Sequence, residues 1–133
     1  MEKKARNNIK AARVLTKNGF YDSSVSRAYY AVYLAAWHYL KTMNIHPQQK
    51  APKGGYYWSY HKLPEILCDE YGCIGPAQME KLELIYSRRI KADYTVDNIE
   101  KEEAQNSLSI AINFIAFFLK SLLPLGVQLI ELS

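Results

Sequence analysis

Cysteine is scarce in this sequence of 133 residues, where only Cys68 and Cys73 occur. Their spacing is not that of a C-x-x-C pair, and no second pair of Cys or His ligands completes a zinc site. We therefore expect free thiols in a reducing cytoplasm, and neither a bound metal ion nor another cofactor.

Long hydrophobic runs are also missing. The most apolar stretch, residues 108–123, is interrupted by Asn113 and Lys120 and is shorter than the about 20 residues that a membrane-spanning helix needs. The first ten residues, MEKKARNNIK, are polar and lack the apolar segment of a signal peptide. The sequence therefore predicts a cytoplasmic protein that does not cross a membrane.

The common signatures of catalysis and phosphate binding are absent as well. There is no Gly-rich phosphate loop, no H-E-x-x-H motif and no nucleophile elbow. The net charge is +4 and the sequence pI is about 9.0. This mildly basic balance is compatible with RNA, a nucleotide or an acidic protein as partner, but it requires none of them.

Apolar periodicity, together with Gly and Pro breaks, predicts five helices and no strand of useful length. The expected ranges are 2–17, 22–44, 62–71, 76–93 and 97–123. The second of these is apolar nearly all round, which is typical of a helix surrounded by others. We predict an all-α, up-and-down bundle of four main helices plus one short helix. It forms one domain over residues 1–123, followed by a C-terminal tail at 124–133.

The start of the last helix carries a capping-box pattern, Asp97 followed by Glu100. Its apolar face is wide, and Phe114 and Phe117 extend beyond it. A surface larger than one small bundle can bury suggests that this helix pairs with a second copy of the chain.

Residues 45–60 form a long loop with four aromatic residues near its end. These are Tyr56, Tyr57, Trp58 and Tyr60. Beside Lys50 and Lys53 they could stack on nucleic-acid bases. We favour the alternative, in which they fold back as a lid on the bundle.

Arg27 lies on the second helix, and a buried or half-buried arginine needs a partner. Asp93 and Tyr94, at the end of the fourth helix, are its predicted partners. The second and fourth helices would then share a cleft.

Three segments together resemble HEPN domains, the higher-eukaryote and prokaryote nucleotide-binding domains, over residues 1–122. They are Ser26-Arg27-Ala28-Tyr29-Tyr30-Ala31, His61, and Arg89-Ile90-Lys91-Ala92-Asp93-Tyr94. The resemblance implies an up-and-down helical bundle that commonly forms a homodimer. It also implies frequent partnership with a minimal nucleotidyltransferase, often as a toxin–antitoxin pair.

The same resemblance bears on activity. Ribonuclease members of the family carry an Arg, then a polar residue, and a His four to six residues after the Arg. Here Arg89 matches the Arg, but Ile90 replaces the polar residue and Tyr94 stands where the His is expected. A tyrosine with an ordinary pKa of about 10 is a poor general base at neutral pH.

The sequence therefore favours a nucleotide- or RNA-binding module without ribonuclease activity. Its expected binding residues are Arg27, Tyr30, His61, Arg88, Arg89, Asp93 and Tyr94.

Two alternatives stay open. One is a metal-independent RNA endonuclease in which Arg89 acts with Tyr94, or with His61 or His38 brought in by the fold. The other is a purely structural interaction module, in which Arg27, Asp93 and Tyr94 only hold helices together.

Overall fold

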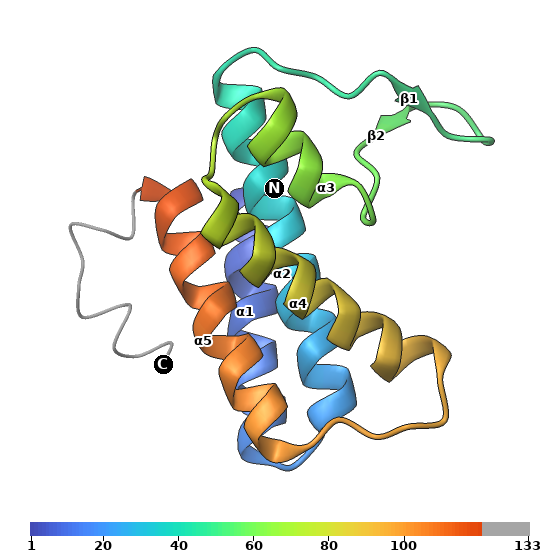
Figure 1. The fold of residues 1–133 in the computed structure, drawn as a ribbon, viewed down its shortest axis with the longest axis vertical. Coiled ribbons are helices and arrows are strands. Elements are labelled where there is room, and N and C mark those ends of the chain that lie inside the picture. Colours follow the sequence, from blue (N-terminus) through green and yellow to red (C-terminus); the bar gives the residue numbers. More distant parts are fainter. Residues whose placement is uncertain (121–133) are drawn as a thin grey trace.

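The computed structural model of the protein describes residues 1–120. Within these residues lie four long helices (Figure 1), which are α1 (Glu2–Lys17), α2 (Tyr21–Thr42), α4 (Pro76–Tyr94) and α5 (Lys101–Phe118). Between α2 and α4 lie four short elements, which are β1 (Gln49–Lys50), β2 (Tyr56–Tyr57), α3 (Leu63–Glu65) and the π-helix η1 (Ile66–Glu70). The predicted all-α bundle is confirmed.

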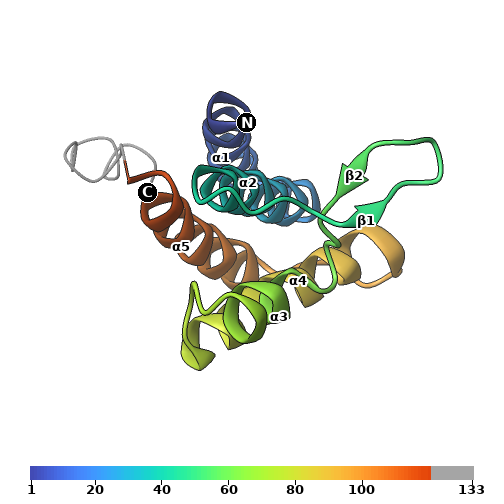
Figure 2. The same cartoon turned by 90° about the horizontal axis from the view of Figure 1, so that it is seen from above.

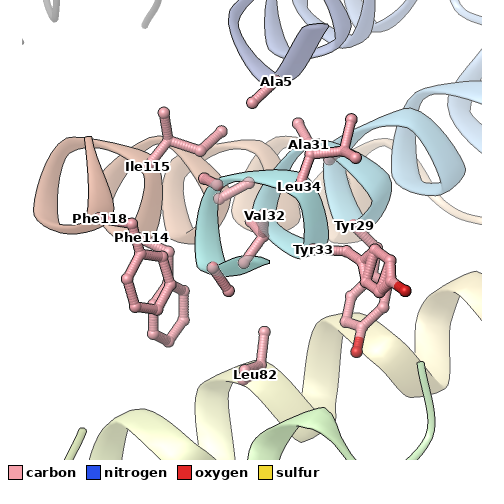
Figure 3. Close-up of a cluster of buried hydrophobic side chains, with 14 of the residues drawn as sticks. Ala5, Tyr29, Ala31, Val32, Tyr33, Leu34, Leu82, Phe114, Ile115 and Phe118 are labelled. Atoms are coloured by element: carbon pink, nitrogen blue, oxygen red, sulfur yellow. The ribbon is translucent and has the colours of Figure 1, made fainter. Parts of the chain in front are cut away.

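Helix α2 is the centre of the bundle and contacts α1, α4 and α5. Figure 3 shows its side chains pointing toward all three neighbours, with Ala5 on α1, Leu82 on α4 and Ile115 on α5. The stretch from Ala31 to Ala36 is buried without interruption. The nearly all-round apolar pattern of this helix therefore arises because neighbours surround it.

The link between α4 and α5 differs from the expectation. The capping residue of α5 is Glu100, whose backbone N–H donates to Oε1 of Glu103 at 3.0 Å, so the predicted start at Asp97 is wrong. The preceding residues are held elsewhere, because the backbone N–H of Ile99 donates to Oδ1 of Asp22 at 2.9 Å. Ile99 is also buried beside Val25, so this segment is tied to α2 before α5 begins.

The other end of α5 is also earlier than expected, since the helix ends at Phe118 and not near residue 123. The predicted tail at 124–133 lies outside the described residues. Phe114 stacks on Phe118 and is only 5% exposed, so it does not extend beyond the buried face as expected. Phe117 does, with 41% of its surface exposed.

The predicted third helix at 62–71 is a single α-helical turn followed by the π-helix. Pro64 sits in the first turn, where its missing N–H is not needed. Leu63 and Leu67 are fully buried and fix this short segment to the bundle.

The 45–60 loop has two parts, of which only the second packs on the helices. Its first part is a hairpin in which Gln49 pairs with Tyr57 and Lys50 with Tyr56, strands too short for a period-two pattern to reveal. Figures 1 and 2 show this hairpin extending away from the helices. Its second part, residues 58–60, returns to the bundle as expected.

Two hydroxyls of α2 hold the returning part. Tyr33 donates to the backbone carbonyl of Trp58 at 2.7 Å, and Tyr29 donates to that of Tyr60 at 2.6 Å. Trp58 is 5% exposed, whereas Tyr56 on the hairpin is 58% exposed. The lid interpretation is therefore right for Trp58 and Tyr60 and wrong for Tyr56.

None of the helices within residues 1–120 combines the length and the apolar character that crossing a membrane requires.

Candidate functional site

Arg89, near the end of α4, is the centre of the site. Its side chain is 18% exposed. Its guanidinium carbon lies 4.6 Å from the ring centre of Tyr60 and 6.0 Å from that of Tyr29. Both rings present a negative π-face to the cation, which fixes the plane of the guanidinium group.

Asp93, one turn further along α4, holds another edge of the same group. Its Oδ2 lies 3.5 Å from Nε of Arg89. Its Oδ1 accepts a 2.5 Å hydrogen bond from the hydroxyl of Ser26, which connects α4 to α2. Within residues 1–120, no hydrogen bond joins the two terminal nitrogens of Arg89 to a protein group, and the Nε contact with Asp93 is the ion pair of this side chain.

A second cation, Lys4, acts on the phenol of Tyr60. Burial and the neighbouring Tyr30 raise the pKa of its phenol, whereas Arg89 and Lys4 act in the opposite direction. Lys4, on α1, also lies 5.6 Å above the ring of Tyr30. The phenol of Tyr60 thus stays protonated at neutral pH and lies within the field of two cations from different helices.

His61 lies on the same side of α4. Its ring centre is 5.6 Å from that of Tyr86, which in turn lies 5.2 Å from that of Tyr29. Tyr86 and Arg89 are three residues apart on one helix and therefore share a face. The exposed imidazole of His61 thus contacts the residue of α4 that lies three positions before Arg89.

The expected pairing of Arg27 with Asp93 is wrong. Arg27 is exposed and donates to Oδ1 of Asn8 at 3.3 Å, on α1. Asn8 is itself buried, and its amide donates to the backbone carbonyl of Lys4 at 2.8 Å. Successive helical residues point about 100° apart. Ser26 is therefore the residue of α2 that faces Asp93, while Arg27 faces α1.

Arg88 points away from Arg89 toward α5. Its Nη1 donates to Oδ1 of Asn106 at 2.8 Å and to Oγ of Ser107 at 3.0 Å, and its Nε lies 3.9 Å from Oε2 of Glu103. Arg88 connects α4 to α5 and takes no part in the Arg89 cluster.

The remaining residues predicted from the sequence are Tyr30, Tyr94 and His38, and they differ in their relation to the Arg89 cluster. Tyr30 is half-buried and stacks on Tyr33, at the Lys4 end of the aromatic cluster. Tyr94 is 71% exposed and contributes to the electrostatic field at Tyr60. His38 lies 3.9 Å from Glu2 of α1 and is not part of the cluster.

The predicted site omitted Lys4, Ser26 and Tyr29, and Tyr60 was considered only as a lid or base-stacking residue. Ser26 and Tyr29 had a signal, because both belong to the quoted segment from Ser26 to Ala31. Lys4 had none, because it looks like any other basic residue on the outer face of the first helix. Over residues 1–120, no three His, Cys, Asp or Glu side chains are grouped as a metal site would require.

Comparison with known proteins identifies the class to which this arrangement belongs. Residues 2–122 match the HEPN domain family, so the chain is a member of that family. A protein of Methanocaldococcus jannaschii named "Putative toxin MJ0605" is 32% identical over 118 residues, which cover 89% of this chain and 83% of that protein. No solved structure shows a significant match to the sequence.

Proposed function

We propose that this chain is the HEPN component of a toxin–antitoxin system and binds the phosphate of a nucleotide or RNA without cleaving it. Arg89 carries the proposal. Its guanidinium plane is fixed by Tyr60 and its Nε by Asp93, while its terminal nitrogens have no protein partner among the described residues.

Such a prearranged arginine suits a phosphate. Two parallel N–H groups of a guanidinium match two phosphate oxygens. Lys4 adds a second positive charge, and the protonated phenol of Tyr60 adds a hydrogen-bond donor. Because the rings and Asp93 already hold Arg89, little side-chain entropy is lost when the anion binds.

Absence of cleavage is part of the proposal. Tyr94 stands where ribonuclease members of the family carry His, and a phenol is a weak general base at neutral pH. Its side chain is also 71% exposed, so burial does not hold the phenol against a bound phosphate.

The proposal includes a homodimer and a minimal nucleotidyltransferase partner, both of which the family implies. Phe117 supports a partner on α5, because an aromatic ring that is 41% exposed at the edge of a buried face is stabilised when a second surface covers it. Light scattering should give twice the monomer mass, and Phe117→Ser should shift the protein toward the monomer. A monomeric wild type would contradict this part.

Calorimetric titration with AMP, ATP and a short RNA tests binding. Arg89→Ala should weaken affinity at least about tenfold, or about 1.4 kcal/mol. Arg88→Ala is the matched control, because it removes the same charge from the next position of the same helix. It should lower the melting temperature and leave affinity unchanged. Equal affinity of wild type and Arg89→Ala would refute the proposal.

A second candidate function is metal-independent RNA cleavage by Arg89 and His61. The observation that favours it is the ring contact of His61 with Tyr86, which lies three residues before Arg89 on α4. An imidazole there could move a proton while the guanidinium stabilises charge on phosphate.

This candidate is tested by incubating end-labelled RNA with the protein in EDTA. Cleavage that His61→Ala abolishes and His38→Ala leaves intact would favour the enzyme over the binding module. Intact RNA with the wild type would exclude it.

A further inference from the structure

We propose that the β1–β2 hairpin, residues 46–57, is an arm that binds single-stranded nucleic acid and extends the Arg89 site along several nucleotides. The inference deepens the proposed function, since it names the ligand as a polymer instead of a mononucleotide. It has its own support in the charge and the geometry of the hairpin.

Charge is strongly divided between the two halves of the chain. Residues 1–64 hold 11 of the 17 Lys and Arg residues but only 2 of the 13 Asp and Glu residues, a net charge of +9. The remaining residues have a net charge of −5. The mild overall value of +4 therefore hides a basic half, which contains α1, α2 and the hairpin.

The helices of the basic half and those of the acidic half also occupy different parts of the molecule. Figure 2 shows α1, α2 and the hairpin on one side of the molecule, and α3 and α4 on the other. No Asp or Glu occurs between Asp22 and Glu65, so no acidic residue of the hairpin itself offsets its lysines. A surface of this kind attracts a polyanion and repels acidic segments.

The hairpin combines cations with an open aromatic ring. Lys50 on β1 lies directly opposite Tyr56 on β2, and Tyr56 is 58% exposed. Lys53 lies in the turn between the strands and is exposed as well. Single-stranded nucleic acids are bound by this pairing of features, in which lysines contact phosphates and aromatic rings stack on bases.

The arm is joined to the Arg89 site through a short and well-fixed segment. Two residues, Trp58 and Ser59, separate the end of β2 from Tyr60, whose ring covers Arg89. Trp58 is buried, and its carbonyl accepts the hydrogen bond from Tyr33. The base of the arm therefore has a defined position, and a strand with one phosphate at Arg89 can continue toward Tyr56.

An acidic protein would also be attracted by the lysines, but the exposed ring at Tyr56 favours nucleic acid. Every base offers a flat π-face on which such a ring can stack. Tyr30 and Tyr60 both pack on Tyr33, so the aromatic surface continues from the base of the arm toward Arg89.

The test compares a labelled twelve-nucleotide RNA, its DNA counterpart and AMP as ligands of the full chain. The arm variant is Lys50→Gln/Lys53→Gln/Tyr56→Ser, in which all three positions are exposed. The control is Lys81→Gln/Lys101→Gln, which removes the same charge from the acidic half. Melting temperatures of both variants should match that of the wild type.

The arm variant should bind the twelve-nucleotide RNA at least about tenfold more weakly and bind AMP with unchanged affinity. The slope of log affinity against log salt should fall by about 1.4, because two phosphate contacts are lost. The control variant should leave both quantities unchanged. The ratio of RNA to DNA affinity shows which of the two strands is preferred.

The outcomes separate this inference from the proposed function. If the arm variant binds the oligonucleotides as tightly as the wild type, the proposed role of the hairpin is wrong. Loss of binding in Arg89→Ala would in that case still support the Arg89 site. If the wild type binds AMP but no oligonucleotide, the arm is again wrong and its charge suits an acidic protein. If the arm variant loses binding and Arg89→Ala does not, the arm stands and the proposed site fails.

Discussion

Arg89 and Tyr60 are stacked, with 4.6 Å between the guanidinium carbon and the ring centre. Tyr60 belongs to a loop, so the precision of the site depends on how that loop is held. The hydroxyls of Tyr29 and Tyr33 hold it by donating to the backbone carbonyls of Tyr60 and Trp58. Helix α2 thus positions a residue of α4 through the loop between them.

The stack itself can be tested at Tyr60. Tyr60→Phe keeps the ring over Arg89 and should change the free energy of unfolding by less than about 0.5 kcal/mol. Tyr60→Leu removes the cation–π contact and the packing on Tyr33, and should cost about 1–2 kcal/mol. Urea denaturation followed by circular dichroism measures both. Equal costs for the two variants would show that the ring contributes nothing specific.

The hydroxyl of Tyr29 should be as important as its ring. Tyr29→Phe leaves the carbonyl of Tyr60 without its partner, which should cost about 1–3 kcal/mol and weaken anion binding at Arg89. Tyr39→Phe is the control, because Tyr39 is a half-buried residue of the same helix whose hydroxyl has no hydrogen bond in the described region. If both variants unfold at the same urea concentration, the hydroxyl of Tyr29 does not anchor the loop.

The same tyrosine predicts a loss of stability at high pH. Burial raises the pKa of Tyr29 well above its usual value, so the folded protein keeps this phenol neutral while the unfolded chain ionises near pH 10. Stability is therefore fully present below about pH 10 and decreases above it, by about 1.4 kcal/mol per pH unit for this group. Tyr29→Phe should show a shallower decrease between about pH 10 and 12.

Tyr94→Phe provides the comparison for that experiment, because it removes an exposed phenol. Because that side chain is exposed, Tyr94→Phe should leave the free energy of unfolding at pH 7 unchanged. A Tyr29→Phe profile as steep as the wild type would mean that Tyr29 ionises equally in both states.

Arg27 should matter little for stability, in contrast to the expectation from sequence. Arg27→Ala removes an exposed side chain and one long hydrogen bond to Asn8, which should cost less than about 1 kcal/mol. A buried pair with Asp93 would have cost about 3–5 kcal/mol when broken. Chemical denaturation distinguishes the two values, and a cost in the higher range would restore the original pairing.

The contrast between Arg27 and Ser26 shows what could be predicted from the sequence. The helices of the bundle and the central position of α2 follow from apolar periodicity, because burial on several sides leaves a clear pattern. The partners of single polar side chains do not follow, because they depend on the rotation of each helix. A rotation by one residue exchanges Ser26 for Arg27 at the face that meets Asp93.

The loop between α2 and α3 shows a second limit. Its aromatic residues suggested a lid, and Trp58 and Tyr60 do form one, but nothing in the sequence divides them from Tyr56. The division arises from the hydroxyls of Tyr29 and Tyr33, which are about one helical turn apart and capture two carbonyls two residues apart. Such contacts between distant segments have no local signature.

Glu103 should make stability depend on pH at the acidic end. Its carboxylate accepts from the backbone N–H of Glu100 at 3.0 Å and from Lys91 at 3.1 Å, and these contacts, with Arg88, lower its pKa against the effect of burial.

Glu103→Ala should cost about 1–2 kcal/mol at neutral pH, through the lost cap and ion pair. A lowered pKa stabilises the fold fully above the unfolded value of about 4.3, and this contribution is lost as the pH falls through the lower pKa of the folded state, so the cost should be smaller at pH 3 than at pH 7. Glu102→Ala removes a neighbouring charge without these hydrogen bonds and should cost about 0.5 kcal/mol. Unfolding curves at pH 7 and pH 3 measure both variants. Equal costs at pH 7 would reduce the role of Glu103 to its charge near the start of α5.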